Sequence, residues 1–235
     1  MKTFLLFIDD CYGAEAEKVA LTGLLIPTNS YAELRRQFYQ LLSKKISPTP
    51  TTIQTPPELH GCDLLRNESD EEKLRILKGV KDLVLSNSIR IHRTCIYETD
   101  KIIKIFSGDT NGPLSACWLY FISGLDPILK DILVIPVFDF VDKEKIIKLS
   151  GMIKSADIIR ESGHNDLVSI KNSKNIIGEV FYADSGHSIF IQATDLISYL
   201  LHSQECVATG SSTSQFKKQV ADIAKELLPA FINVK

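Results

Sequence analysis

The stretch Phe4–Asp10, FLLFIDD, indicates the fold more clearly than any other part of the sequence. An apolar run followed at once by two acids is typical of a short buried strand that ends at the edge of a sheet. A second apolar run, Val19–Pro27 (VALTGLLIP), follows a short polar segment that opens with the turn Cys11–Gly13. The simplest connection between two such runs is an antiparallel hairpin, and it places Asp9 and Asp10 at the end of the first strand.

Helical and strand-like patterns alternate through the rest of the chain, which predicts an α/β protein with a mixed sheet flanked by helices. Helical spacing of apolar residues predicts helices at 30–43, 70–85, 113–129, 142–159, 188–202 and 214–228. Apolar runs and alternation predict strands at 89–97, 132–140, 167–170 and 176–182. The segment 47–57, rich in Pro and Thr, is predicted to be an extended loop.

No repeat or shift in composition divides the chain, so we expect one domain over residues 1–235. Its core is expected to extend to about residue 203, with a C-terminal helix at about 213–230 packed on that core. Within the core, Trp118 is expected to be buried rather than to serve as a platform for a nucleic-acid base.

Charge and cysteine content limit the classes of function. The formal net charge is −2, which is not the strongly positive balance of many nucleic-acid-binding proteins, although a local basic face remains compatible with it. The five scattered cysteines fit neither a zinc ribbon nor a disulfide framework, and they are expected to be small buried side chains in a reducing compartment.

No apolar run approaches the roughly 20 residues that span a bilayer, so we expect a cytoplasmic protein without a membrane partner.

Acidic residues occur within three strongly apolar segments. Asp9 and its neighbour Asp10 follow the first strand, Asp139 lies in VIPVFDF, and Asp195 lies in IFIQATDLISYLL. An ionised carboxylate is costly to bury unless it is paired or bound to a metal, and neighbouring carboxylates repel one another unless a cation lies between them. Mg²⁺ and Mn²⁺ prefer such oxygen ligands, so the pattern predicts a site for one or two of these ions. Two ions about 4 Å apart support cleavage of a phosphodiester.

Each of these acids also has a structural explanation that the sequence leaves open. Asp9 or Asp10 can simply end a strand and begin a turn. Asp139 can cap a following helix, and Asp195 can accept a hydrogen bond from the backbone of a neighbouring element. It is the occurrence of all three along one α/β chain that favours a shared metal ion.

Four segments match a known family pattern in order and spacing across roughly residues 1–203. FIDDCYG (7–13) corresponds to a strand-end Asp-Glu-Ser-Gly motif, PELHG (57–61) to a Glu-Leu-His segment, VIPVFDF (134–140) to a later strand bearing an Asp, and DSGHSIFIQATDLISYLL (184–201) to Asp-Ser followed by Gln-x-Ala-Asp-Leu. Together they resemble the domain of unknown function 3800 family, whose members are similar to ribonuclease-H-like nucleases. The resemblance implies a ribonuclease-H-like mixed sheet with an N-terminal antiparallel hairpin.

The resemblance also implies a set of functional residues. The acidic quartet of metal ligands and catalytic residues would be Asp9, Glu58, Asp139 and Asp195. Glu58 enters this set mainly through the resemblance, because alone it would be an ordinary solvated acid. Residues expected beside the metal ligands or in contact with substrate are Asp10, His60, Ser185 and Gln192. Gln192 precedes Asp195 by three residues and therefore shares a helix face with it.

The leading hypothesis is a metal-dependent nuclease or related phosphodiester hydrolase, with DNA or RNA as its partner and its oligomeric state open. The chain departs from the family pattern at Asp10 and Cys11, where Glu and Ser are usual. This departure and the lack of a basic balance motivate an alternative, a non-catalytic or regulatory module that binds nucleic acid or protein and keeps the fold. A phosphoryl-transfer enzyme acting on small nucleotides is a third possibility.

Overall fold

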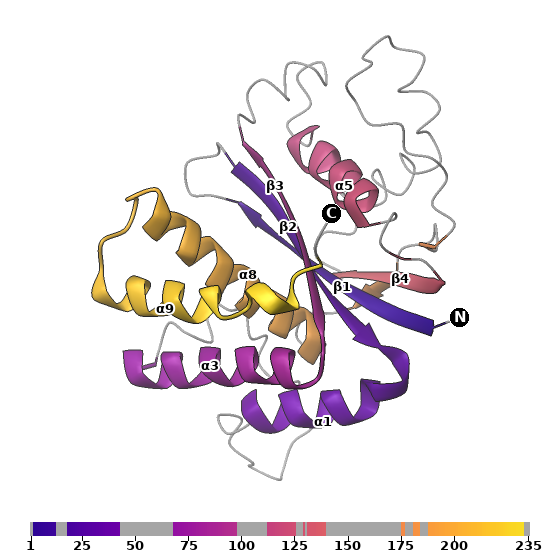
Figure 1. Ribbon diagram of the computed structural model, residues 1–235, viewed down its shortest axis with the longest axis horizontal. Coiled ribbons are helices and arrows are strands. Elements are labelled where there is room, and N and C mark those ends of the chain that lie inside the picture. The colour runs from indigo at the N-terminus through magenta and orange to yellow at the C-terminus, as the bar shows by residue number, and fades with distance from the viewer. Residues whose placement is uncertain are drawn as a thin grey trace, which may run out of the picture.

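The computed structural model describes residues 2–12, 18–42, 68–97, 112–125, 129, 131–139, 175–176, 181–183 and 188–232. Within these ranges the chain is an α/β protein built on a mixed five-stranded sheet in the order β3-β2-β1-β4-β5 (Figure 1). The strands are β1 (Lys2–Tyr12), β2 (Lys18–Pro27), β3 (Arg90–Tyr97), β4 (Ile132–Asp139) and β5 (Phe181–Ala183). The predicted α/β class and mixed sheet are confirmed.

Strands β1 and β2 form the predicted N-terminal antiparallel hairpin, and β3 extends it on the far side of β2. The prediction that β1 ends at Asp9 and Asp10 is wrong, because the strand continues to Tyr12. The reason is the long partner strand: β2 stays paired with β1 as far as the pair Tyr12 and Val19, so the ladder satisfies the backbone of these polar residues. Only the pairing with β4 stops earlier, at the pair Ile8 and Phe138.

The other half of the sheet is parallel. Strand β4 lies beside β1, and β5 lies beside β4, both in parallel orientation. A hairpin extended on one side and joined on the other to parallel strands is the strand order of a ribonuclease-H-like sheet. The segment predicted as a strand at 176–182 contributes only β5 and an isolated bridge between Ile176 and Val134. The predicted strand 167–170 and helix 142–159 lie outside the described residues.

Helices cover both faces of the sheet (Figure 1). One face carries α1 (Tyr31–Leu42), α3 (Asp70–Ser86), α8 (Ile189–Ala208) and α9 (Gln215–Lys225), and the opposite face carries α5 (Gly112–Leu125). Two short 3-10 turns, η1 (Thr28–Ser30) and η5 (Leu228–Ala230), complete the described elements. Ser69, Ser188 and Ser214 each accept a hydrogen bond from a backbone N–H in the first turn of α3, α8 and α9.

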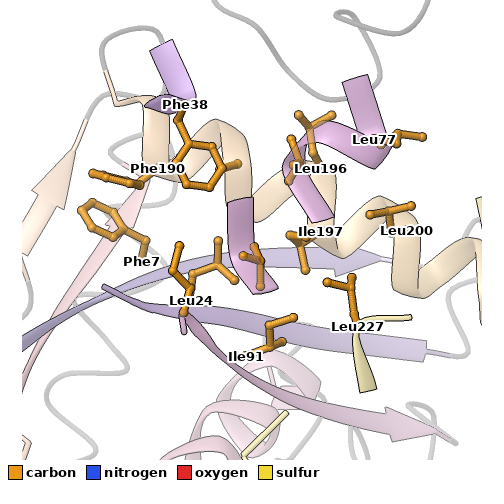
Figure 2. Packing of buried hydrophobic residues seen from close by; sticks show 14 of the residues in the cluster. Phe7, Leu24, Phe38, Leu77, Ile91, Phe190, Leu196, Ile197, Leu200 and Leu227 are labelled. Atoms are coloured by element: carbon orange, nitrogen blue, oxygen red, sulfur yellow. The ribbon is translucent and has the colours of Figure 1, made fainter. Parts of the chain in front are cut away.

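The first hydrophobic cluster fills the space between the sheet and the four helices (Figure 2). The ring of Phe190 in α8 lies 5.0 Å from the ring of Phe7 in β1 and 5.7 Å from that of Phe38 in α1. Aromatic side chains bury large areas, so these contacts fix the start of α8 over β1. Farther along, Leu227 after α9 packs into the same cluster.

The second cluster lies between the sheet and α5. Trp118 is 0 % exposed, stacks on Phe121 and meets Phe138 edge to face, which confirms the prediction that it belongs to the core. Gly23 lies under this helix, where a Cβ atom would come within 2.7 Å of Phe121. Close approach of α5 to β2 therefore requires a glycine at this position.

Candidate metal centre

Asp9 and Asp139 belong to the neighbouring parallel strands β1 and β4. The last residues paired between these strands are Ile8 and Phe138, so each aspartate comes directly after that pair. Paired strands are about 4.8 Å apart, which brings the two acids to one end of the parallel pair. Both side chains are partly buried. The structure thus brings to one end of two neighbouring strands two acids that are 130 residues apart along the chain.

Alternation along the strands places both aspartates on the face covered by α8. Phe7 and Val137 belong to the cluster on that face, and Asp9 and Asp139 each follow two residues later. Asp10 alternates with Asp9 and comes two residues after Ile8, which belongs to the cluster under α5. Its carboxylate therefore lies on the face of the sheet opposite to Asp9. Burial raises the pKa of Cys117 on that face to about 12, and the charge of Asp10 adds a small contribution in the same direction.

Asp195 comes to the same region on α8. Two contacts lie on either side of it along the helix: the ring of Phe190 packs against that of Phe7, and the hydroxyl of Ser198 shares a hydrogen bond of 3.1 Å with that of Thr22. Thr22 is in turn the residue directly opposite Asp9 in the β1–β2 ladder. Since Asp195 precedes Ser198 by three residues, the two lie on one side of the helix.

The remaining predicted site residues divide into two groups. Gln192 is 5 % exposed and lies one turn before Asp195 on α8. Glu58, His60 and Ser185 lie outside the described residues. In the described ranges, no three His, Cys, Asp or Glu side chains are grouped closely enough to hold a metal ion. The described part of the site is therefore a set of carboxylates at one end of one sheet face.

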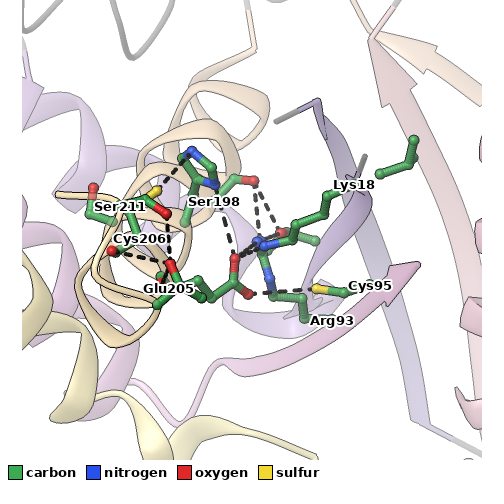
Figure 3. A network of polar contacts seen from close by, with 12 residues as sticks. Lys18, Arg93, Cys95, Ser198, Glu205, Cys206 and Ser211 are labelled. Carbon is green, nitrogen blue, oxygen red and sulfur yellow. Dashed lines mark hydrogen bonds and ion pairs between the residues drawn. The ribbon is translucent and has the colours of Figure 1, made fainter. Parts of the chain in front are cut away.

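Sequence reasoning did not find the polar network that borders these acids (Figure 3). Arg93 in β3 donates from Nη1 to Thr22 Oγ1 at 2.6 Å and from Nη2 to Glu205 Oε2 at 3.2 Å. Lys18 pairs with the same Glu205 carboxylate, and burial lowers the pKa of this lysine. The only sign of Arg93 in the sequence was the alternation of side chains along its strand, which puts Arg93 on the same face as Ile91.

Thiols line the far end of this network. Cys95 donates to Glu205 at 3.6 Å, and Cys206 lies 3.4 Å from Nε2 of His202. Burial raises the pKa of Cys11, which follows Asp9 on the same strand face. Cys95, Cys206 and Cys11 are only partly buried, so the expectation of simple buried thiols holds for Cys117 alone among the described cysteines.

We compared the chain with protein-family models, curated proteins and solved structures. Nothing in these three sets matches it. The proposed function therefore rests on the fold and on the position of the acids.

None of the helices within the described ranges is both long and apolar enough to cross a membrane.

The donor chemistry of the described acids fits a hard divalent cation. Asp9, Asp139 and Asp195 offer only oxygen donors, which Mg²⁺ and Mn²⁺ prefer over nitrogen or sulfur. Neighbouring carboxylates repel one another, and a cation between them relieves this repulsion. Mg²⁺ usually keeps several water ligands and binds few protein groups directly, so widely set carboxylates remain compatible with it.

Proposed function

We propose that this protein is a divalent-metal-dependent phosphodiester hydrolase, a nuclease that binds one or two Mg²⁺ or Mn²⁺ ions. One observation carries the proposal: Asp9 and Asp139 follow the last residues paired between two parallel strands, on the face over which α8 carries Asp195. The four-segment resemblance to the domain of unknown function 3800 family supports it and adds Glu58 as a fourth ligand.

In this proposal the chain's own residues bind the cation, orient one another's side chains and enclose the site. Asp9 and Asp139 are held by the backbone ladder of a rigid sheet, whereas Asp195 is held by a helix packed on that sheet. Gln192 is buried one turn earlier on α8, and in this proposal it orients the Asp195 carboxylate. When bound, the cation would neutralise the acids, polarise the scissile phosphate and favour an attacking water.

The proposed substrate is nucleic acid, either DNA or RNA. Its anionic backbone would approach a cluster of acids only when divalent cations offset their charge. Cleavage should therefore require metal at every substrate concentration. The largely buried cations Lys18 and Arg93 lie on the same sheet face as the acids.

The test is cleavage of labelled single-stranded DNA, duplex DNA, RNA and RNA–DNA hybrid with Mg²⁺ or Mn²⁺. We expect the wild-type protein to cleave at least one substrate and EDTA to abolish the activity. Asp9→Asn and Asp195→Asn should each reduce the rate by about 100-fold or more, because loss of a ligand costs at least as much as the 10–100-fold typical of residues beside a ligand.

Asp222→Asn is the matched control, since Asp222 is an exposed acid that pairs with Lys225 at the surface of α9. It should leave the rate unchanged. Equal cleavage by the wild type and the Asp9 and Asp195 variants, or cleavage that resists EDTA, would contradict the proposal. Absence of cleavage together with absence of Mn²⁺ binding would favour a non-catalytic binding module instead.

A further inference from the structure

Arg93 is an almost fully buried cation on the sheet face that carries the acids. Its side chain is 6 % exposed, and it projects from β3 on the side covered by α8. A buried guanidinium is costly unless its donors are satisfied, and a planar fork of donors can bind several acceptors at once. The partners of Arg93 therefore indicate what the residue holds in place.

Its partners come from two different elements. Nη1 donates to Thr22 Oγ1 of β2 at 2.6 Å and lies 3.4 Å from Ser198 Oγ of α8, and Nη2 donates to Glu205 Oε2 of α8 at 3.2 Å. Thr22 and Ser198 also bond to each other. Figure 3 shows Arg93 reaching from the sheet toward both Ser198 and Glu205 on the helix. Arg93 thus ties α8 to the sheet at two points about two turns apart, because Ser198 and Glu205 are seven residues apart.

The first of these points adjoins two of the proposed ligands. Thr22 is the cross-strand partner of Asp9, and Ser198 lies one turn after Asp195. The position of α8 along the sheet at Ser198 therefore sets how far Asp195 lies from Asp9. Like charges disfavour the close approach of carboxylates, so a contact that fixes α8 on the sheet at Ser198 favours an arrangement in which Asp195 lies near Asp9.

We propose that Arg93, together with Thr22, Ser198 and Glu205, is a positioning clamp that docks α8 so that Asp195 is held beside Asp9 before any cation binds. The proposal rests on the proposed function, because it assigns the clamp to the same metal centre. A protein whose binding-competent state is only partly populated binds its ligand more weakly by that fraction. Loss of the clamp should therefore weaken metal binding without removing any ligand.

The experiment measures Mn²⁺ affinity by calorimetric titration at 25 °C for the wild type, Arg93→Met and Arg93→Lys. We expect Arg93→Met to bind Mn²⁺ about 10-fold more weakly, in the range typical of groups that orient metal ligands. Arg93→Lys should recover part of the affinity, because lysine keeps the charge but lacks the fork of donors. Thr22→Val, which keeps the side-chain shape and loses the shared hydroxyl, should also weaken binding.

Lys81→Met is the matched control. Lys81 is another largely buried cation with carboxylate partners, Glu226 and Asp82, but it links α3 to the residue after α9, away from the acids. It should lower thermal stability without changing Mn²⁺ affinity. Thermal unfolding of every variant identifies those that are folded at 25 °C, and Thr22→Val and Arg93→Lys keep the test decisive if Arg93→Met unfolds.

Hydrogen exchange of the α8 amides gives a readout that a merely structural role would not change. In metal-free protein, Arg93→Met should speed exchange across residues 192–200, and saturating Mn²⁺ should remove the difference from wild type. Equal acceleration with and without Mn²⁺, or wild-type affinity in a folded Arg93→Met, would overturn the clamp. Failure of the wild type itself to bind Mn²⁺ would instead overturn the proposed function, so the two failures are distinguishable.

Discussion

At the residue scale, His92 is a buried base whose environment is well defined. Its Nε2 donates to the backbone carbonyl of Phe121 at 2.8 Å, and its ring meets the Phe121 ring edge-on with 4.5 Å between centroids. Burial lowers the pKa of His92 because the charged imidazolium is poorly solvated there, although the hydrogen bond to Phe121 opposes this shift. His92 is therefore neutral in the folded protein at neutral pH.

This lowered pKa makes folding stability depend on pH. The unfolded chain, with a histidine pKa near 6.5, binds more protons than the folded chain as the pH falls through about 6.5. The free energy of unfolding should thus be greatest above this pH and should decline on acidification until the pH passes below the folded pKa. Urea unfolding between pH 5 and 8 should show a shallower decline for His92→Gln, which keeps a donor for Phe121 and does not ionise.

His202 contributes in the same direction, because burial and the nearby cations Lys18, Lys217 and Arg93 lower its pKa too. A residual slope in His92→Gln is therefore expected. Identical slopes in the wild type and His92→Gln would show that His92 is not a neutral buried base.

Individual residues differ in how visible their roles are in the sequence. Asp139 and Asp195 were identified as candidates because an acid inside an apolar run is conspicuous locally, and the structure places them on one face together with Asp9. Arg93 was not identified, because its partners Thr22, Ser198 and Glu205 are 71, 105 and 112 residues away. No local pattern encodes such contacts, which arise only when β2, β3 and α8 come together.

At the scale of elements, α8 is the helix on which the site depends most. Its first turn begins at Ser188, whose hydroxyl accepts a hydrogen bond from the N–H of Ile191 at 3.4 Å. The first N–H groups of a helix have no partner within the helix, so a side-chain acceptor at this position stabilises the helix start. This start lies next to Phe190 and hence close to the contact with β1.

Ser188→Ala should lower the free energy of unfolding by about 1 kcal/mol, because alanine leaves the donor without its side-chain acceptor. Ser188→Asn should retain nearly all of the stability, since asparagine is an equally good residue at this position. Urea denaturation of the three proteins measures both effects. Equal losses for Ala and Asn would show that the hydroxyl's bond to Ile191 is not what stabilises the start of α8.

Most elements followed from periodicity, because amphipathic helices and alternating strands carry their pattern locally. Helix α3 begins at Asp70 and β4 begins at Ile132, both as predicted. The end of β1 did not follow, since Asp9–Tyr12 has no apolar pattern of its own and is a strand only because β2 pairs with it. Pairing partners, rather than composition, decide such ends.

At the scale of the whole molecule, the sheet separates two hydrophobic clusters. Ile76 in α3 belongs to the cluster on the α8 side, and Ile122 in α5 belongs to the opposite one. Each is 1 % exposed, so removal of one methyl group should cost about 0.5–1.5 kcal/mol at either site. The order β3-β2-β1-β4-β5 was not predicted beyond the N-terminal hairpin, because periodicity does not state which strands become neighbours.

Ile76→Val and Ile122→Val should be additive. Side chains on opposite faces of the sheet share no packing partners, so the loss in the double variant should equal the sum of the single losses within about 0.5 kcal/mol. Urea denaturation should show one cooperative transition in all four proteins, the wild type included, because strands β1 and β2 contribute to both clusters. Larger coupling would mean that the sheet transmits packing changes from one face to the other.

The apolar character of both faces has a consequence for how the chain tolerates insertions and deletions. In a sheet with one solvated face, a gain or loss of one residue brings apolar side chains into water. Here Leu6 and Phe7 would exchange one apolar environment for another. Loss of one residue before Asp9 would carry Asp9 to the α5 side and bring Asp10 to the α8 side in its place. The doublet Asp9–Asp10 would therefore leave a carboxylate on the α8 side of the sheet after the loss of one residue from β1.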